Sequence, residues 1–257
     1  MGECWDSLHD GVGEFHSVFV LEEVASTQNE ARRLARSTPG IAVVADRQVS
    51  GRGRQGRMWS DSNGQALSMS MVSRSGLPPS GLSLAVGLAV IDACQALGAT
   101  GLGLKWPNDV VERHLRGRGR KLAGVLIEVA DGLSCIGVGL NVGQSSEDWP
   151  DALKNSAVSL RQLGVQADRP AVARAVLEAV SVWLKAAPEA IRERWSEIGT
   201  LRGQRCVFRV EGRTLEGVVV DLDALWRLVV RCEDGRRVRL DSAHAHLEQV
   251  GLLGSLT

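Results

Sequence analysis

The sequence has no net charge, because its 30 lysines and arginines balance its 30 aspartates and glutamates. This balance gives no reason to expect bulk binding to nucleic acid or to a membrane surface. The five cysteines are scattered without a CxxC pair, so neither a thiolate metal site nor a disulfide framework is indicated. Glu3, Asp6 and His9 stand where a secretory signal would have a basic segment and an apolar one. We therefore expect a cytoplasmic protein with reduced thiols.

Long apolar runs are also scarce, and the one present lies at residues 81–100. It contains Asp92 together with several glycines and alanines, which favours a buried helix over a membrane span. With 44% hydrophobic and 23% charged residues, the composition is typical of a globular protein without a membrane partner. The 257 residues are enough to bury a sizeable core in one or two domains.

Hydrophobic periodicity and turn residues predict the secondary structure of the first part of the chain. Residues 1–17 are expected to form a poorly ordered or variable start. Thr27 and Glu30 fit a capping box, with Thr27 as the N-cap of a helix that ends near Ser37. Pro107 is expected to end a strand in a turn. Further helices are predicted at 81–97, 171–184 and 189–198, and strands at 41–45, 66–71, 102–105, 122–129 and 133–140, the last two joined by a turn at Asp131-Gly132.

The character of the sequence changes after Gly203, where short apolar segments alternate with turns. Strands are predicted at 207–210, 215–220, 228–230 and 238–240, with turns at Glu211-Gly212 and Asp234-Gly235. Several short strands in succession are typical of a small barrel. We therefore place a domain boundary near residue 200, between a first domain of residues 1–200 and a second of residues 201–257.

A loop rich in glycine and arginine, GRGRQGR at residues 51–57, follows the first buried strand. It matches the pattern GxGxxG, but turn-forming residues follow it at 59–64, where a dinucleotide-binding fold needs a helix. Its glycines let the backbone approach a ligand closely, and Arg52, Arg54 and Arg57 supply forked donors for phosphate or carboxylate. A solvated basic loop and a nucleic-acid-binding arm are the alternatives that this motif alone leaves open.

Two further motifs follow in order: KWPND at residues 105–109 and KLAG at residues 121–124. Together with the loop at 51–57, they resemble the signature of biotin protein ligases. The similarity continues at residues 137–141 and covers most of residues 20–250. It also includes three polar residues earlier in the chain: Ser26, Thr27 and Gln48.

The resemblance implies an α+β fold. Its first domain would be a catalytic domain related to class II aminoacyl-tRNA synthetases, with a mixed sheet and helices, and its second an SH3-like C-terminal β-barrel. It implies a ligase that activates biotin with ATP to biotinyl-5′-AMP and transfers biotin to a lysine of a biotin carboxyl carrier protein, of the acetyl-CoA or acyl-CoA carboxylase type. Too few residues precede Ser26 for a helix-turn-helix domain, so we expect a monofunctional ligase without DNA binding, acting as a monomer or a homodimer.

The first step of such a reaction brings two anions together, the biotin carboxylate and the α-phosphate of ATP, so the site needs cations. The resemblance assigns this role to Arg52, Arg54 and Lys121. It also implies that the loop folds over biotin and the adenylate and excludes water, because a mixed anhydride hydrolyses when exposed. Asp109 would orient or deprotonate the acceptor lysine in the second step.

The resemblance also implies a full set of ligand contacts. The biotin-binding residues would be Ser26, Thr27, Gln28, Gln48, Gly51, Arg52, Gly53, Arg54, Trp59, Lys121 and Gly124. The residues around ATP and the adenylate would be Arg54, Arg57, Asn108, Asp109, Lys121 and Asn141. Gln28 departs from the asparagine common in the family, which leaves the contact of its side chain open. Mg²⁺ is implied because ATP brings it, and no protein-held metal is expected.

Simpler interpretations remain open for several of these residues. Trp59 could be a core tryptophan, Asp109 and Asn141 could be turn residues, and Lys121 could be an exposed loop lysine. The basic run at 113–120, longer than expected for the family, could be a solvated hairpin tip or could touch a carrier protein or another subunit. For the whole chain, the alternatives are a lipoate protein ligase and a non-catalytic module in which the barrel is the functional part.

Overall fold

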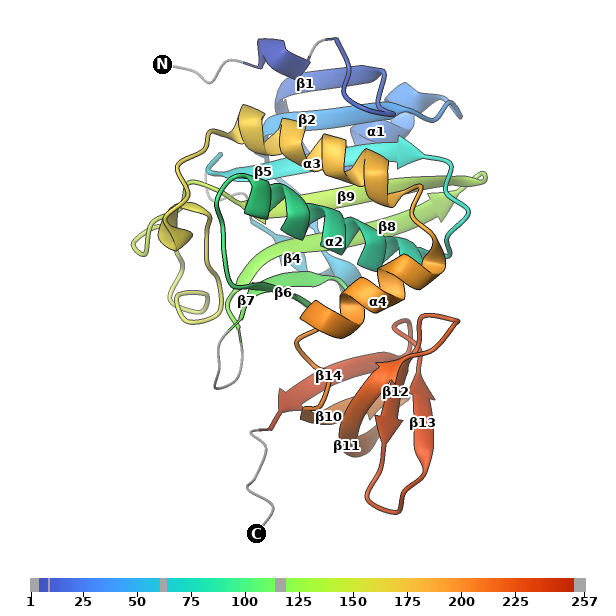
Figure 1. Ribbon diagram of the computed structural model, residues 1–257. Helices are drawn as coiled ribbons and strands as arrows, with labels where there is room; N and C mark the ends of the chain where they lie inside the picture. The colour runs from blue at the N-terminus through green and yellow to red at the C-terminus, as the bar shows by residue number, and fades with distance from the viewer. Residues whose placement is uncertain (1–4, 9, 61–63, 114–118, 252–257) are drawn as a thin grey trace.

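The computed structural model of the protein describes residues 5–8, 10–60, 64–113 and 119–251. Its larger part is built on a seven-stranded sheet (Figure 1) with the order β1-β2-β5-β9-β8-β7-β6. The β1–β2 pair is parallel and the remaining pairs are antiparallel, so the predicted mixed sheet is confirmed. The strands are β1 (Ser17–Val24), β2 (Ile41–Gln48), β5 (Ala66–Ser73), β6 (Leu102–Lys105), β7 (Asp109–Glu112), β8 (Lys121–Ala130) and β9 (Leu133–Asn141).

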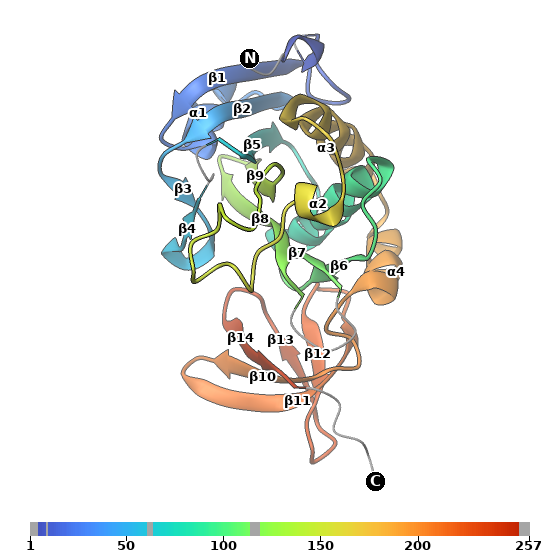
Figure 2. The same ribbon diagram turned by 90° about the vertical axis from the view of Figure 1, so that its left-hand side faces the viewer.

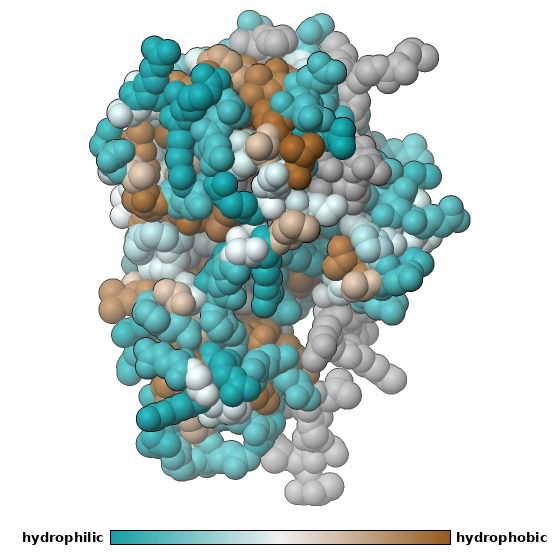
Figure 3. Space-filling model, turned by 180° about the vertical axis from the view of Figure 1, so that it is seen from behind, coloured by the Kyte–Doolittle hydropathy of each residue, from teal (hydrophilic) through white to brown (hydrophobic). Residues whose placement is uncertain are grey.

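Three helices, α2 (Pro79–Ala96), α3 (Arg169–Trp183) and α4 (Pro188–Ile198), lie in front of the sheet in Figure 1. A fourth, α1 (Thr27–Ala35), packs on the opposite face, where hydrophilic side chains predominate around smaller hydrophobic patches (Figure 3). Successive residues of a strand point to opposite faces. In β2, Ile41 accordingly packs in the cluster under α1, whereas Ala42 packs in the main core.

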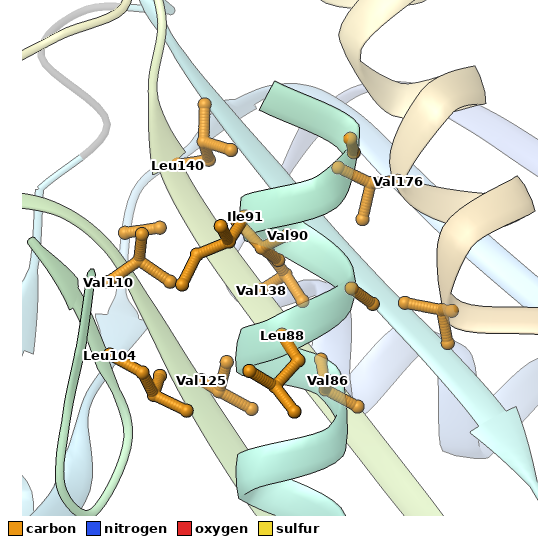
Figure 4. Close-up of a cluster of buried hydrophobic side chains, with 14 of the residues drawn as sticks. Val86, Leu88, Val90, Ile91, Leu104, Val110, Val125, Val138, Leu140 and Val176 are labelled. Carbon is orange, nitrogen blue, oxygen red and sulfur yellow. The ribbon is translucent and has the colours of Figure 1, made fainter. Parts of the chain in front are cut away.

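The helix α2 is the centre of the main core, as predicted from the long apolar run. It is long and apolar enough to cross a membrane by length and composition, but 72% of it is buried within this protein. Leu88 and Ile91 point toward Leu104, Val125 and other side chains of the sheet (Figure 4). A helix that is apolar on all sides is expected where sheet and helices enclose it.

The start of the chain is not the poorly ordered segment that we expected, as far as the structure describes it. Leu8 and Phe15 are fully buried, and Trp5 is nearly so. The Trp5 indole donates a hydrogen bond to Asp46 (Nε1–Oδ1, 3.1 Å), and the guanidinium carbon of Arg169 lies 5.5 Å from the centre of the Trp5 ring. These contacts anchor the start of the chain to the strand β2 and to the helix α3.

The predicted capping box is wrong. The helix α1 begins at Thr27 with Ser26 as its N-cap, which makes no side-chain capping bond, and ends at Ala35. The strand β1 was missed, and so was β7, which begins two residues after Pro107. The strand before Pro107 does end at Lys105, as predicted.

The rest of the chain forms a five-stranded antiparallel sheet with the order β13-β12-β11-β10-β14, the predicted small barrel. Its strands are β10 (Arg205–Val210), β11 (Arg213–Leu222), β12 (Leu228–Arg231), β13 (Arg237–Leu240) and β14 (Ala245–Val250), the last of which was missed. The chain passes from α4 to β10 through residues 199–204. The domain boundary at residue 200 falls in this connection and stays a prediction.

Candidate active site

Two adjoining cavities open between the start of α1, the strands β8 and β9, and a hairpin made of β3 (Gly51–Arg52) and β4 (Met58–Trp59). The first has a volume of about 250 Å³ and the second of about 880 Å³. Every residue that the sequence predicted for the site lines one or both of them. Those lining both are Gln48, Trp59, Asp109 and Lys121, together with Met58 and Lys105.

A polar network holds one wall of the first cavity. The backbone N–H of Thr27 donates to Gln48 Oε1 at 2.8 Å, and the Thr27 hydroxyl lies 3.1 Å from the same oxygen and 2.8 Å from the hydroxyl of Ser70. Gly51 leaves room for this arrangement, because a Cβ there would lie 2.6 Å from Gln48 Nε2. The bonds fix the orientation of the Gln48 amide beside the cavity.

Gln28 lies in the same wall and is 5% exposed. Its Nε2 donates to the carbonyl oxygen of Leu126 at 3.2 Å, and its side chain packs on Gly137, where a Cβ would lie 2.7 Å from Nε2. Its Oε1 is buried and has no hydrogen-bond partner among the described residues. A buried acceptor without a partner is costly, so this oxygen is ready to accept a hydrogen bond from a ligand.

Trp59 and Lys121 stand where the two cavities meet. The Trp59 ring lies directly against Gly139, where a Cβ would come within 2.3 Å of Cε2. Lys121 Nζ lies 5.8 Å from the centre of the ring and 2.6 Å from Asp109 Oδ1. Gly124, which pairs with Gly139 across the sheet, leaves room for the lysine in the same way. Trp59 is therefore a cavity wall, and Asp109 opens β7 as the partner of a cation.

The Gly/Arg loop forms a short hairpin with no helix after it, as far as residue 60. Arg52 donates to Asn29 Oδ1 at 2.8 Å, and Arg54 donates to the carbonyl oxygen of Ser242 in the barrel. Burial lowers the pKa of the Arg54 guanidinium, and the nearby charge of Asp109 opposes that shift. Arg54 and Arg52 thus place positive charge at the edge of the first cavity.

Two asparagine amides, of the partly buried Asn108 and the buried Asn141, brace the strands around the site. Asn108 Nδ2 donates to the carbonyl oxygen of Val125 at 2.9 Å. Asn141 Nδ2 donates to the carbonyl oxygens of Lys121 at 3.2 Å and Val158 at 3.0 Å. Asn141 ends the strand β9, so the interpretation as a turn residue is wrong.

Some lining residues were not among those predicted. Lys105 opens the KWPND motif, which could have pointed to it. Trp149 in the second cavity and residues 245–247 of the barrel come from segments without a motif, so nothing in the sequence singled them out. In the basic run at 113–120, residues 114–118 lie outside the described residues, and Arg120 pairs with Glu112 at 2.7 Å. The described part of the chain holds no group of three or more metal-ligating side chains.

Comparisons with known proteins place the chain among ligases of one family. Residues 20–143 match the biotin/lipoate A/B protein ligase family, and residues 202–244 match the biotin protein ligase C-terminal domain. The chain is 35% identical to the biotin–acetyl-CoA-carboxylase ligase of Mycobacterium tuberculosis, over 81% of this chain and 82% of that protein. The corresponding ligase of Paracoccus denitrificans is 30% identical, over 85% and 96%.

The chain spans about half the length of another relative, the bifunctional ligase/repressor BirA of Bacillus spizizenii, with 36% identity over 60% of this chain and 49% of that protein. Among solved structures, it is similar to the biotin protein ligase from Aquifex aeolicus in complex with biotin and ATP. The TM-score is 0.78 at 28% identity, and the match covers 90% of this chain and 98% of that one.

Proposed function

The chain belongs to the biotin protein ligase family, and from this membership we propose that it activates biotin with ATP and biotinylates a carrier protein. One observation carries the proposal: two cavities of different size meet at the Lys121–Asp109 ion pair, where Nζ and Oδ1 are 2.6 Å apart. Such a junction can hold a small acid and a nucleotide with their reacting groups side by side. A cytoplasmic location, which supplies ATP, fits this reaction.

The first, smaller cavity takes biotin. Its wall offers what a ureido ring needs, namely hydrogen-bond donors and acceptors. Thr27 and Gln48 supply a fixed hydroxyl and amide. The unpartnered Oε1 of Gln28 accepts a ureido N–H, so the glutamine performs this contact through its side chain. The second, larger cavity, which includes Asn141 and Trp149, takes the nucleotide.

The first chemical step takes place where the cavities meet. A carboxylate oxygen of biotin bonds to the α-phosphorus of ATP, and the bond to pyrophosphate breaks. Lys121, Arg52 and Arg54 offset the repulsion between the two anions. Mg²⁺ enters as part of the ATP complex, so removing it with a chelator should stop adenylate formation.

The second step uses Asp109, the ion-pair partner of Lys121. When Lys121 turns toward the bound anions, the Asp109 carboxylate loses its cation and can accept a proton. The amine nitrogen of the acceptor lysine then bonds to the acyl carbon, AMP leaves, and the proton passes to Asp109. The acceptor is a biotin carboxyl carrier protein or domain of the acetyl-CoA carboxylase type.

The test is incubation of the protein with biotin, Mg-ATP and a biotin carboxyl carrier domain. The intact mass of the carrier should rise by one biotinyl group. Lys121→Ala should nearly abolish pyrophosphate release, whereas Lys154→Ala should not. The control is matched because Lys154 also lies 2.6 Å from an aspartate, Asp151, but on the open surface. A folded protein that leaves the carrier mass unchanged would refute the proposal.

A lipoate ligase is the second candidate, because the family model of residues 20–143 includes both acids. The match of residues 202–244 to the C-terminal domain of biotin protein ligases favours biotin. Competition separates them: unlabelled biotin should displace labelled biotin from the protein, and lipoate at the same concentration should not.

A further inference from the structure

The barrel is fixed against the catalytic part by contacts of residues that line neither cavity. Trp226 of the barrel is 4% exposed and fills a hollow over α2 that exists because residue 81 is glycine. A Cβ at Gly81 would lie 2.6 Å from the Trp226 ring. The guanidinium carbon of Arg192 in α4 lies 5.5 Å from the centre of the same ring. The face that the barrel turns toward the site is therefore held in a defined position.

One segment of that face reaches the site. Ala245, His246 and Leu247, at the start of β14, line the first cavity together with the Gly/Arg loop. Figure 2 shows the β3–β4 hairpin on the same side of the molecule as β14. One part of the wall of the first cavity is therefore shared by two segments of the chain that lie almost 200 positions apart in the sequence.

Two neighbouring residues of the loop are bound to this segment and to Ser242 just before it. Gln55 Nε2 lies 2.7 Å from His246 Nδ1, and Arg54 donates to the carbonyl oxygen of Ser242. Gln55 has a φ of 58°, a left-handed conformation that L-residues rarely adopt. A backbone in such a conformation persists only when its surroundings hold it. The contact with His246 is a hydrogen bond that can do so.

We propose that His246 is a positioning residue for the ligase reaction. It holds Gln55, and through Gln55 it keeps the guanidinium groups of Arg52 and Arg54 over the first cavity. The inference rests on the proposed function. His246 lies outside both segments that match the family models, 20–143 and 202–244, so those models do not assign it a role.

The first experiment measures the loop without any substrate. Limited digestion with trypsin cleaves after arginine, and the loop contains Arg52, Arg54 and Arg57. His246→Ala should accelerate cleavage at these positions, read by mass spectrometry, while the unfolding temperature stays close to that of the wild type. The matched control is His244→Ala, which changes an exposed histidine two residues before His246.

The second experiment measures biotin-dependent pyrophosphate release. His246→Ala should lower kcat/KM by between about fivefold, the worth of one neutral hydrogen bond, and about a hundredfold, the cost of a displaced catalytic group. Gln55→Ala should give the same loss, and the double variant should be no worse than either single one, because both remove one contact. His246→Asn, whose amide can bond to Gln55 from nearly the same place, should restore most of the rate.

The outcomes separate the inference from the proposed function. A wild-type protein that releases no pyrophosphate with biotin and ATP would overturn the function, and the positioning role with it. If the wild type is active and His246→Ala matches His244→Ala in both reaction rate and trypsin cleavage, that result would overturn the positioning role alone. So would additive losses in the double variant, or a variant that loses stability and activity together without rescue by asparagine.

Discussion

Gly139→Ala is the substitution that most directly tests how the two cavities are divided. Gly139 lies on β9 under the Trp59 ring, and its own φ is not in the left-handed region, so alanine meets no backbone strain there. Its Cβ, however, would lie 2.3 Å from Trp59 Cε2, where real Cβ atoms keep at least 3.0 Å. The ring must therefore shift by about 0.7 Å, the difference between those two distances.

The cost of this shift should appear in catalysis more than in folding. Trp59 lies at the junction of the cavities, with Lys121 Nζ 5.8 Å from the centre of its ring. Adding a methyl group to a well-packed site costs about 1–3 kcal/mol, and about 1.4 kcal/mol corresponds to a tenfold change. Because the displaced ring enters the space meant for ligands, we expect kcat/KM for adenylate formation to fall by about tenfold to a hundredfold.

The assay is biotin-dependent exchange of pyrophosphate into ATP, combined with calorimetric titration of biotin. Gly143→Ala is the matched control, because its Cβ would make only ordinary contacts, the nearest at 3.7 Å from the carbonyl oxygen of Gln65. If Gly139→Ala binds biotin and reacts as fast as Gly143→Ala, then Trp59 does not divide the cavities in the way described.

Three further predictions concern other parts of the protein. Asp109→Asn should slow transfer of biotin to the carrier more than it slows formation of the adenylate. Single-turnover measurements of the two steps would reveal this difference. Equal losses in both steps would contradict the role of Asp109 as a base. Trp226→Ala should destabilise the protein by about 3–5 kcal/mol in urea unfolding, because it empties the hollow over α2; a change below about 1 kcal/mol would mean that the barrel is not held there. Burial raises the pKa of Cys94 and of Cys206 to about 12. Among the described cysteines, alkylation at pH 8 should therefore be confined to the half-exposed Cys232. Labelling of Cys94 in the folded protein would count against the described core.

The elements that the sequence predicted well are those whose local signals and tertiary surroundings agree. The run at 81–100 is mostly apolar, and 72% of α2 is buried. The turn between β8 and β9 has a φ of 52° at Asp131 and 71° at Gly132, which suits the Asp-Gly pair found there. In such cases local preference alone is enough to identify the element.

The errors arose where distant parts of the chain decide the outcome. Thr27 has the pattern of an N-cap, but its hydroxyl is used by Ser70 and Gln48, which approach from other strands. The strand β1 carries exposed glutamates and depends on parallel pairing with β2, which no local pattern reveals.

In the site too, residues in compact local motifs were predicted, and residues brought in by distant parts of the chain were missed. The three motifs at 51–57, 105–109 and 121–124 converge on the cavities, and they were recognisable because each is compact in the sequence. The share of the wall that residues 245–247 contribute depends on how the barrel is docked. The roles of the site residues in binding and catalysis stay predictions.

That shared wall limits how relatives of this protein can be recombined. A barrel taken from another member of the family would bring its own residues opposite Gln55 and Arg54, and its own counterpart to the Trp226 ring over Gly81. Chimeras joined in the connection at 199–204 should therefore work only when the loop and the barrel come from the same parent. In this architecture the loop and the barrel that it contacts must be exchanged together, although they are not continuous in the sequence.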